Sequence, residues 1–141
     1  MSRLINFGSL CIDWVYQVPN LVAAGETISS YSRAVHPGGK GLNQSIAAAL
    51  AGADVMHFGA VGEDGAALLK ALDDAGVDTR GIVQLEDGSG HALIQVDSSG
   101  RNAIVIYPGA NRSVPKRQWQ LMFDSMQAGD WLLLQNETND I

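Results

Sequence analysis

The stretch from Pro37 to Gln44 (Pro-Gly-Gly-Lys-Gly-Leu-Asn-Gln) contains the residues best suited to holding a ligand. Its glycines stand where a loop is expected to enter a helix, so the backbone can approach a ligand and the first helical N–H groups stay unpaired. Lys40 and the helix dipole add positive charge there. Asn43 lies one turn after Gly39, and its amide can donate and accept. This set would suit a polyhydroxyl ligand, with or without a phosphate.

Two widespread phosphate-binding motifs do not fit this stretch. A Walker A loop needs Ser or Thr after its lysine and a glycine five positions before the second glycine. Here Gly41 follows Lys40, and Ala34 takes the earlier position. No G-x-G-x-x-G dinucleotide fingerprint occurs either. The simpler alternative is a glycine-rich helix entry with a solvated lysine, and the local residues alone do not separate the two interpretations.

Two carboxylates are placed where α/β sheets bind ligands, just past the carboxyl ends of strands. Asp13 follows the first expected strand and Glu137 the last one. A carboxylate can accept hydrogen bonds from two adjacent sugar hydroxyls. The alternatives are a turn-capping aspartate and a solvated terminal glutamate. Ala92 and Ile94 would lie on one apolar face of a hairpin, where plain packing is the simpler role.

Other reactive side chains form no recognisable site. His36, His57 and His91 are scattered without metal-ligand spacing or an evident nucleophile. Cys11 is interpreted as a packed core thiol rather than a nucleophile. Asp64 is expected to cap a helix rather than to act with its acidic neighbour. We therefore predict no metal site and no catalytic residue from these side chains.

The expected core elements alternate between strand and helix, which indicates a parallel α/β sheet. Apolar runs predict strands at 4–8 and 55–61, and helical spacing predicts helices over 39–51 and 64–76. A helix over 115–126 and a strand over 131–134 follow. That last strand is fully apolar and so belongs in the middle of a sheet. The core would then have only about three parallel strands, fewer than the roughly five or six of an ordinary sheet. The chain is therefore expected to be a fragment.

A different pattern indicates a second, smaller sheet. Short strands are expected at 12–18 and 28–35, and alternation predicts a hairpin of strands 91–96 and 102–107 around the turn at 97–100. These segments, approximately 12–35 and 90–107, would form a small β-sheet set apart from the α/β core.

Composition favours a folded protein and argues against a partner with a large negative charge. Of 141 residues, 46% are hydrophobic and 17% charged, with a net charge of -6. The acidic balance argues against binding to nucleic acid or to an anionic membrane. A single cysteine excludes an internal disulfide and suits a reducing compartment. The N-terminus shows no signal peptide and no run is long enough to cross a bilayer, so a cytoplasmic location is expected.

Together, these stretches resemble the ribokinase branch of the PfkB carbohydrate kinases. The matching pieces occur in family order along nearly the whole chain: Gly8-Ser9 through Asp13, Ala24 to Thr27, Gly38 to Gly41 with Asn43-Gln44, Gly62 to Asp64, Pro108 to Asn111, and Gln135 with Glu137. The Gly-Gly-Lys-Gly-x-Asn-Gln piece is the most specific.

The resemblance implies a fold and a set of substrate contacts. The fold would be the N-terminal half (1–141) of a ribokinase-like, doubly wound parallel sheet, with the small β-sheet as a lid over the sugar. By family pattern, the implied sugar contacts are Asp13, Gly38, Gly39, Lys40, Asn43 and Glu137, with apolar lid contacts from Ala92 and Ile94. Ribokinases resemble Gly-Ser-x-Asn-x-Asp at the first site, whereas this chain has Cys11 in place of the asparagine. A thiol replaces an amide poorly, so a sugar other than ribose, or a modified sugar, is possible.

The resemblance also implies what this chain lacks. The family's catalytic Asp in a Gly-Ala-Gly-Asp motif, its Asn-x-x-Glu motif for Mg²⁺ and its ATP pocket belong to the C-terminal half. The intact parent would transfer the ATP γ-phosphate to a sugar hydroxyl, and this chain alone would be inactive. The alternatives are a non-catalytic sugar-binding module and a nucleoside kinase of the same family. The open sheet edges predict a homodimer or a larger assembly.

Overall fold

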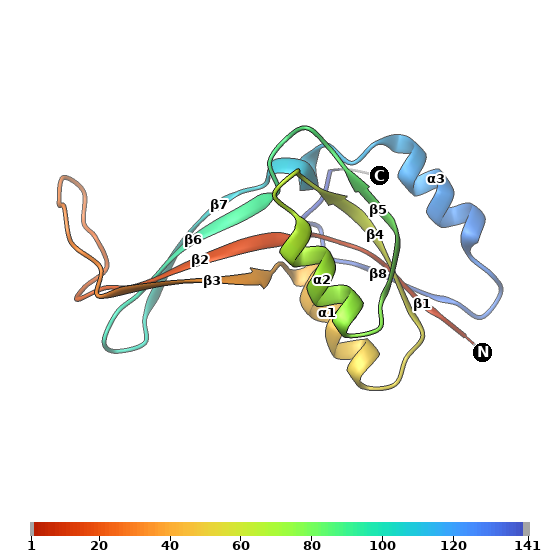
Figure 1. Cartoon of the computed structure of the whole chain (residues 1–141), viewed down its shortest axis with the longest axis horizontal. Helices are drawn as coiled ribbons and strands as arrows, with labels where there is room; N and C mark the ends of the chain where they lie inside the picture. Colours follow the sequence, from red (N-terminus) through yellow and green to blue (C-terminus); the bar gives the residue numbers. More distant parts are fainter. Residues whose placement is uncertain (1, 140–141) are drawn as a thin grey trace.

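The computed structural model describes residues 2–139, which form two β-sheets and three α-helices (Figure 1). Sheet A is parallel and has the order β5-β4-β1-β8. Its strands are β1 (Leu4–Phe7), β4 (Val55–Val61), β5 (Asp78–Gln84) and β8 (Trp131–Leu134). Because parallel strands end at one edge, the loops that follow β1 and β8 emerge side by side.

Helices cover both faces of sheet A, as the alternation of strand and helix predicts. Helices α1 (Lys40–Leu50) and α2 (Ala66–Asp74) pack on one face, around Leu42, Leu68 and Leu72. Helix α3 (Lys116–Ser125) packs on the opposite face, where the buried Met122 meets Phe7 and Phe58. Two buried clusters therefore enclose the sheet and fix the edge from which the loops after β1 and β8 emerge.

Sheet B has the order β3-β2-β6-β7 and projects away from sheet A and its helices (Figure 1). Its strands are β2 (Cys11–Gln17), β3 (Ser32–Gly38), β6 (Gly90–Val96) and β7 (Asn102–Tyr107). β2 pairs with β3 antiparallel and with β6 parallel, and β6 and β7 form the expected hairpin. The expected small second sheet is confirmed. A short 3-10 helix, η1 (Gly109–Arg112), leads the chain back to the α/β layer.

Four details differ from the sequence-based expectations. Sheet A has four strands rather than about three, because β5 was not predicted: Arg80 and Gly81 interrupt its apolar pattern. The strand expected at 28–35 begins at Ser32 and runs to Gly38. The apolar strand β8 lies at the edge of sheet A, not in its middle, and Trp131 is 72% exposed.

The fourth difference concerns Asp64, which does not cap α2. The helix begins after Gly65 without a side-chain cap, and Asp64 accepts a hydrogen bond from the Ser89 backbone N–H at 2.8 Å. This carboxylate therefore ties the start of α2 to the segment before β6. Within residues 2–139, no helix combines the length and apolar character needed to cross a bilayer.

Candidate ligand-binding site

The first turn of α1 lies directly against the chain that leaves β1. The Leu42 N–H donates to the Ser9 carbonyl at 3.0 Å. A Cβ on Gly41 would stand 2.5 Å from the carbonyl carbon of Gly8, closer than any side chain allows. Gly39 has a φ of 98°, a conformation that favours glycine. The close approach of these two backbone segments is therefore the first explanation for glycine at these positions of the predicted motif.

Three side chains from distant parts of the sequence meet above this contact. Lys40 Nζ forms an ion pair with Glu137 Oε1, and Ser9 Oγ donates to Glu137 Oε2 at 2.7 Å. Burial acts to raise the pKa of Glu137, but the hydrogen bonds from Lys40 and Ser9 outweigh it and lower that pKa. Glu137 is therefore ionised at neutral pH, and the Lys40 side chain remains 65% exposed to solvent.

Asp13 occupies the neighbouring position at the base of sheet B. Its carboxylate lies against Gly38, and a Cβ at that position would overlap it. Burial raises the pKa of Asp13, and the nearby Glu137 carboxylate adds to the rise, while His36 opposes it. Ala92 pairs with Asp13 across the sheet, so Ala92 and Ile94, two residues further along β6, lie on the face that carries the Asp13 carboxylate.

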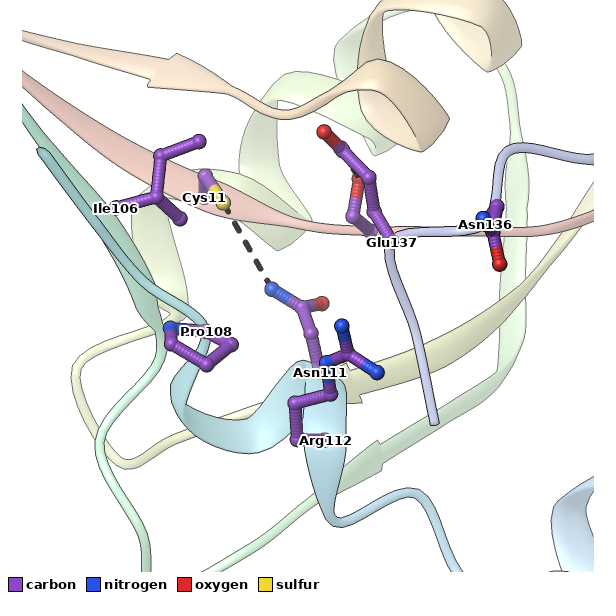
Figure 2. A pocket seen from close by; sticks show the side chains of 8 residues that line it. Cys11, Ile106, Pro108, Asn111, Arg112, Asn136 and Glu137 are labelled. Atoms are coloured by element: carbon purple, nitrogen blue, oxygen red, sulfur yellow. Dashed lines mark hydrogen bonds between the residues drawn. The ribbon is translucent and has the colours of Figure 1, made fainter. Parts of the chain in front are cut away.

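A pocket of about 280 Å³ opens beside Glu137 (Figure 2). Its lining comes from the ends of both sheets, from η1 and from the segment after β8: Ser9, Cys11, Ile106, Pro108, Asn111, Arg112, Asn136 and Glu137. Burial raises the pKa of the Cys11 thiol to about 11, so it is protonated at neutral pH. The thiol is thus a poor nucleophile, in agreement with its interpretation as a packed side chain.

Asn111 ties η1 to the turn between β1 and β2 at this pocket. Its Oδ1 accepts from the Leu10 N–H and its Nδ2 donates to the Leu10 carbonyl, both at 2.9 Å. The same Nδ2 also reaches the Cys11 Sγ at 3.7 Å, the contact drawn in Figure 2. Both hydrogen-bonding groups of this amide are therefore occupied by the turn between β1 and β2.

The structure groups most, but not all, of the predicted contacts. Lys40, Glu137 and Asp13 with Gly38 gather at one edge. Asn43 lies exposed one turn further along α1, and the cluster's hydrogen bonds do not include its side chain. Among the predicted set, only Glu137 lines the pocket. Ser9, Asn111 and Arg112 were not predicted as site residues. The sequence feature that could have identified Ser9 and Asn111 is their place in the motifs Gly8-Ser9 and Pro108 to Asn111. No sequence feature indicates Arg112.

Comparison with known proteins gives this arrangement a family. The model of the pfkB family carbohydrate kinases matches residues 1–136. The chain belongs to the pfkB family. A ribokinase of Haemophilus influenzae is 35% identical over 140 residues, which cover 97% of this chain and 46% of that protein. The chain thus spans about half the length of the curated relatives it matches.

Solved structures agree with this family assignment. A ribokinase of Cryptococcus neoformans in complex with ADP superposes with a TM-score of 0.85 and 37% identity, over 98% of this chain and 43% of that one. The Arabidopsis thaliana ribokinase complexed with ribose and ATP gives a TM-score of 0.71 and 33% identity, over 79% of this chain and 38% of that one. The ribokinase-like α/β fold with a second small sheet is confirmed.

Proposed function

We propose that this chain forms the sugar-binding part of an ATP-dependent carbohydrate kinase, and that residues 1–141 do not transfer phosphate by themselves. The observation that carries the proposal is the Lys40–Glu137–Ser9 cluster beside Asp13, at the strand ends of a pfkB-family fold. Relatives named ribokinases, one of them solved with ribose and ATP, support this substrate class.

The cluster has the hydrogen-bonding capacity that a sugar requires. The Glu137 carboxylate already accepts from Lys40 and Ser9, yet each of its oxygens can accept one more hydrogen bond. The Lys40 ammonium retains free N–H groups, and Asp13 offers a second carboxylate. Two carboxylates and one ammonium can therefore bind adjacent hydroxyls from several directions, while the partly exposed Ile94 offers apolar surface to the ring and Ala92, only 5% exposed, packs beneath it.

Phosphoryl transfer needs groups that these residues do not supply. Within residues 2–139, no three His, Cys, Asp or Glu side chains converge as ligands of a metal ion would. We propose that this chain contributes the sugar contacts and that the contacts to Mg²⁺ and ATP come from the rest of the parent enzyme. By the family pattern, the base and the ATP pocket of the parent enzyme would belong to a C-terminal half outside these 141 residues.

Calorimetry with a panel of pentoses, hexoses and nucleosides tests the proposal. We expect saturable binding of one sugar class, abolished by Lys40→Ala and by Asp13→Ala. Lys70→Ala and Asp74→Ala are matched controls, because these residues form an exposed ion pair on α2, away from the site. A folded chain that binds no sugar would contradict the proposal, and binding of nucleosides alone would favour a nucleoside kinase.

A coupled assay of ADP release tests the second part of the proposal. With the bound sugar and Mg-ATP present, we expect no turnover by this chain. Turnover would contradict the assignment of catalysis to residues outside it. If a longer form of the protein also binds sugar without turnover, the non-catalytic sugar-binding module becomes the better description.

We also propose that the chain self-associates through sheet B. Val35, Leu93 and Val105 lie on the face of sheet B opposite to the Asp13 carboxylate, and each is at least 44% exposed. Surfaces of this kind on a sheet with free edges favour association. Light scattering should give the mass of a dimer or larger species at micromolar concentration. A monomeric mass would count against this proposal, and Val105→Lys should shift an assembly toward monomer.

A further inference from the structure

Three polar side chains are sealed between sheet A and α1, directly beneath the ligand-binding turn. Asn6 on β1, His57 on β4 and Ser45 on α1 each have no exposed surface. Asn6 and His57 are neighbours across the parallel strands, and Ser45 meets them from the helix. A buried polar group destabilises the fold unless it is hydrogen-bonded, so the pairing of these groups must be accounted for.

The donor and the acceptor of each His57 hydrogen bond can be assigned. Its Nε2 lies 3.1 Å from the Gly8 carbonyl oxygen, which can only accept, so Nε2 carries the proton. Burial lowers the pKa of His57 to about 4, so the ring is neutral and Nδ1 has a free lone pair. The Ser45 hydroxyl, 2.8 Å from Nδ1, therefore donates to it.

Asn6 continues the chain in the same direction. Its Nδ2 donates to Ser45 Oγ and to the Gly41 carbonyl, each at 2.8 Å, which uses both amide protons. Its Oδ1 accepts from Gln135 Nε2 at 2.6 Å. The hydrogen bonds thus run from Gln135 through Asn6, Ser45 and His57 to Gly8.

The carbonyls that this network holds belong to the two segments that touch at the ligand site. Gly8 precedes Ser9, which donates to Glu137, and Gly41 follows Lys40, which pairs with Glu137. Apolar side chains of similar size would fill the same space, but they would leave the Gly8 and Gly41 carbonyls without these hydrogen bonds. Both main-chain carbonyls that the network binds, those of Gly8 and Gly41, lie on these two segments. The need to fill the core does not by itself explain this placement.

We propose that Asn6, Ser45 and His57 are positioning residues, which fix the Gly8 and Gly41 carbonyls so that Ser9 and Lys40 meet at Glu137. Their role in ligand binding rests on the proposed function. Their role in ordering the turn does not, because it can be measured without a ligand.

The test replaces the network with apolar side chains of similar shape in the triple variant Asn6→Leu, Ser45→Ala, His57→Phe. Native-state amide exchange is then compared at Leu42, whose N–H bonds to the Ser9 carbonyl, and at Leu93 in sheet B as an internal reference. We expect exchange at Leu42 to accelerate about tenfold, the effect of one lost hydrogen bond of ordinary strength, while Leu93 is unchanged. Met122→Leu, in the core on the other face, is the control variant.

Two further variants keep the proposal falsifiable if the triple variant does not fold. Ser45→Ala removes only the central hydroxyl and should accelerate exchange at Leu42. His57→Gln can still donate to the Gly8 carbonyl, so it should retain slower exchange than His57→Phe. Exchange at Leu42 that stays within twofold of the native rate in folded Ser45→Ala or triple variants would overturn the proposal.

Sugar affinity separates this proposal from the proposed function. If the native chain binds sugar, folded network variants should bind it about tenfold more weakly by calorimetry, although none of the three residues lines the pocket. Native affinity in a folded triple variant would overturn the role in binding. If the native chain binds no sugar, the proposed function fails, and the exchange rates still decide whether the network orders the turn.

Discussion

The stability of this protein should depend on pH through His57, and the size of the effect follows from its burial. The pKa of His57 falls from an ordinary 6.5 to about 4 on folding, because the ring is fully buried. Between these values the unfolded chain binds a proton that the folded chain refuses, so stability rises with pH. At about 1.36 kcal/mol for each pH unit, this difference corresponds to about 3 kcal/mol.

The stabilisation is complete above about pH 6.5 and is lost progressively as the pH falls toward 4. Urea unfolding followed by circular dichroism at pH 7.5, 6.5, 5.5 and 4.5 should show this loss. The apolar triple variant at Asn6, Ser45 and His57 is the control, because it lacks the titrating ring and should lose about 3 kcal/mol less over the same range.

Carboxylates with lowered pKa values do not confuse this comparison. Hydrogen bonds from Ser99 and Arg101 lower the pKa of Asp97 to about 2, so its contribution to stability is lost only as the pH falls below the ordinary value of 3.8. That loss lies below the range tested here. Parallel free energies of unfolding for the native chain and the triple variant between pH 7.5 and 4.5 would refute the reasoning, because they would show that His57 titrates alike in both states.

Three further outcomes are expected from substitutions. Gly39→Ala should destabilise the chain by about 1–2 kcal/mol or more in urea unfolding, because a φ of 98° strains alanine and its Cβ would lie 2.8 Å from the Ser9 carbonyl oxygen. Gly52→Ala is the control for backbone strain alone, because Gly52 has a φ of 93° and open space around it. Equal losses of stability in the two variants would contradict the contribution of the steric clash. Asn111→Ala should cost about 2–3 kcal/mol, since two buried backbone groups of Leu10 lose their partner; a loss below about 0.5 kcal/mol would argue against that pairing. Glu137→Gln should weaken sugar binding in calorimetry at least as much as Lys40→Ala, and unchanged affinity would remove Glu137 from the site.

The parts of the fold that the sequence predicts are those in which local pattern and tertiary environment agree. The helix after Gly39 and the strand Val55–Val61 combine clear periodicity with glycine boundaries, and both are confirmed within one or two residues. Strand β5 was missed because Arg80 and Gly81 break its pattern. Register with β4 and packing against α3 hold it in the sheet instead, and neither is visible in a local window.

The candidate site was predictable where one short segment carries the chemistry. Lys40 and its glycines form such a segment, whereas Ser9 is separated from its partner Glu137 by 128 positions in the sequence. His57 illustrates the opposite difficulty. No metal-ligand spacing surrounds it, yet a histidine within the apolar strand Val55–Val61 indicates a buried hydrogen-bond partner. Asn6 within Leu4–Phe7 gives the same signal, and only the parallel register places the two side by side.

The glycines and the buried polar residues at this site together allow a closely packed turn to keep one conformation. Glycines at positions 8, 39 and 41 let two backbones approach more closely than side chains would allow, but glycine also loses the most conformational entropy when it is ordered. A turn of this composition needs additional contacts to stay in one conformation. The hydrogen bonds from His57 and Asn6 supply them at the carbonyls of Gly8 and Gly41. The side chains of Ser9 and Lys40 then remain free to pair with Glu137 and, in the proposed complex, with a sugar.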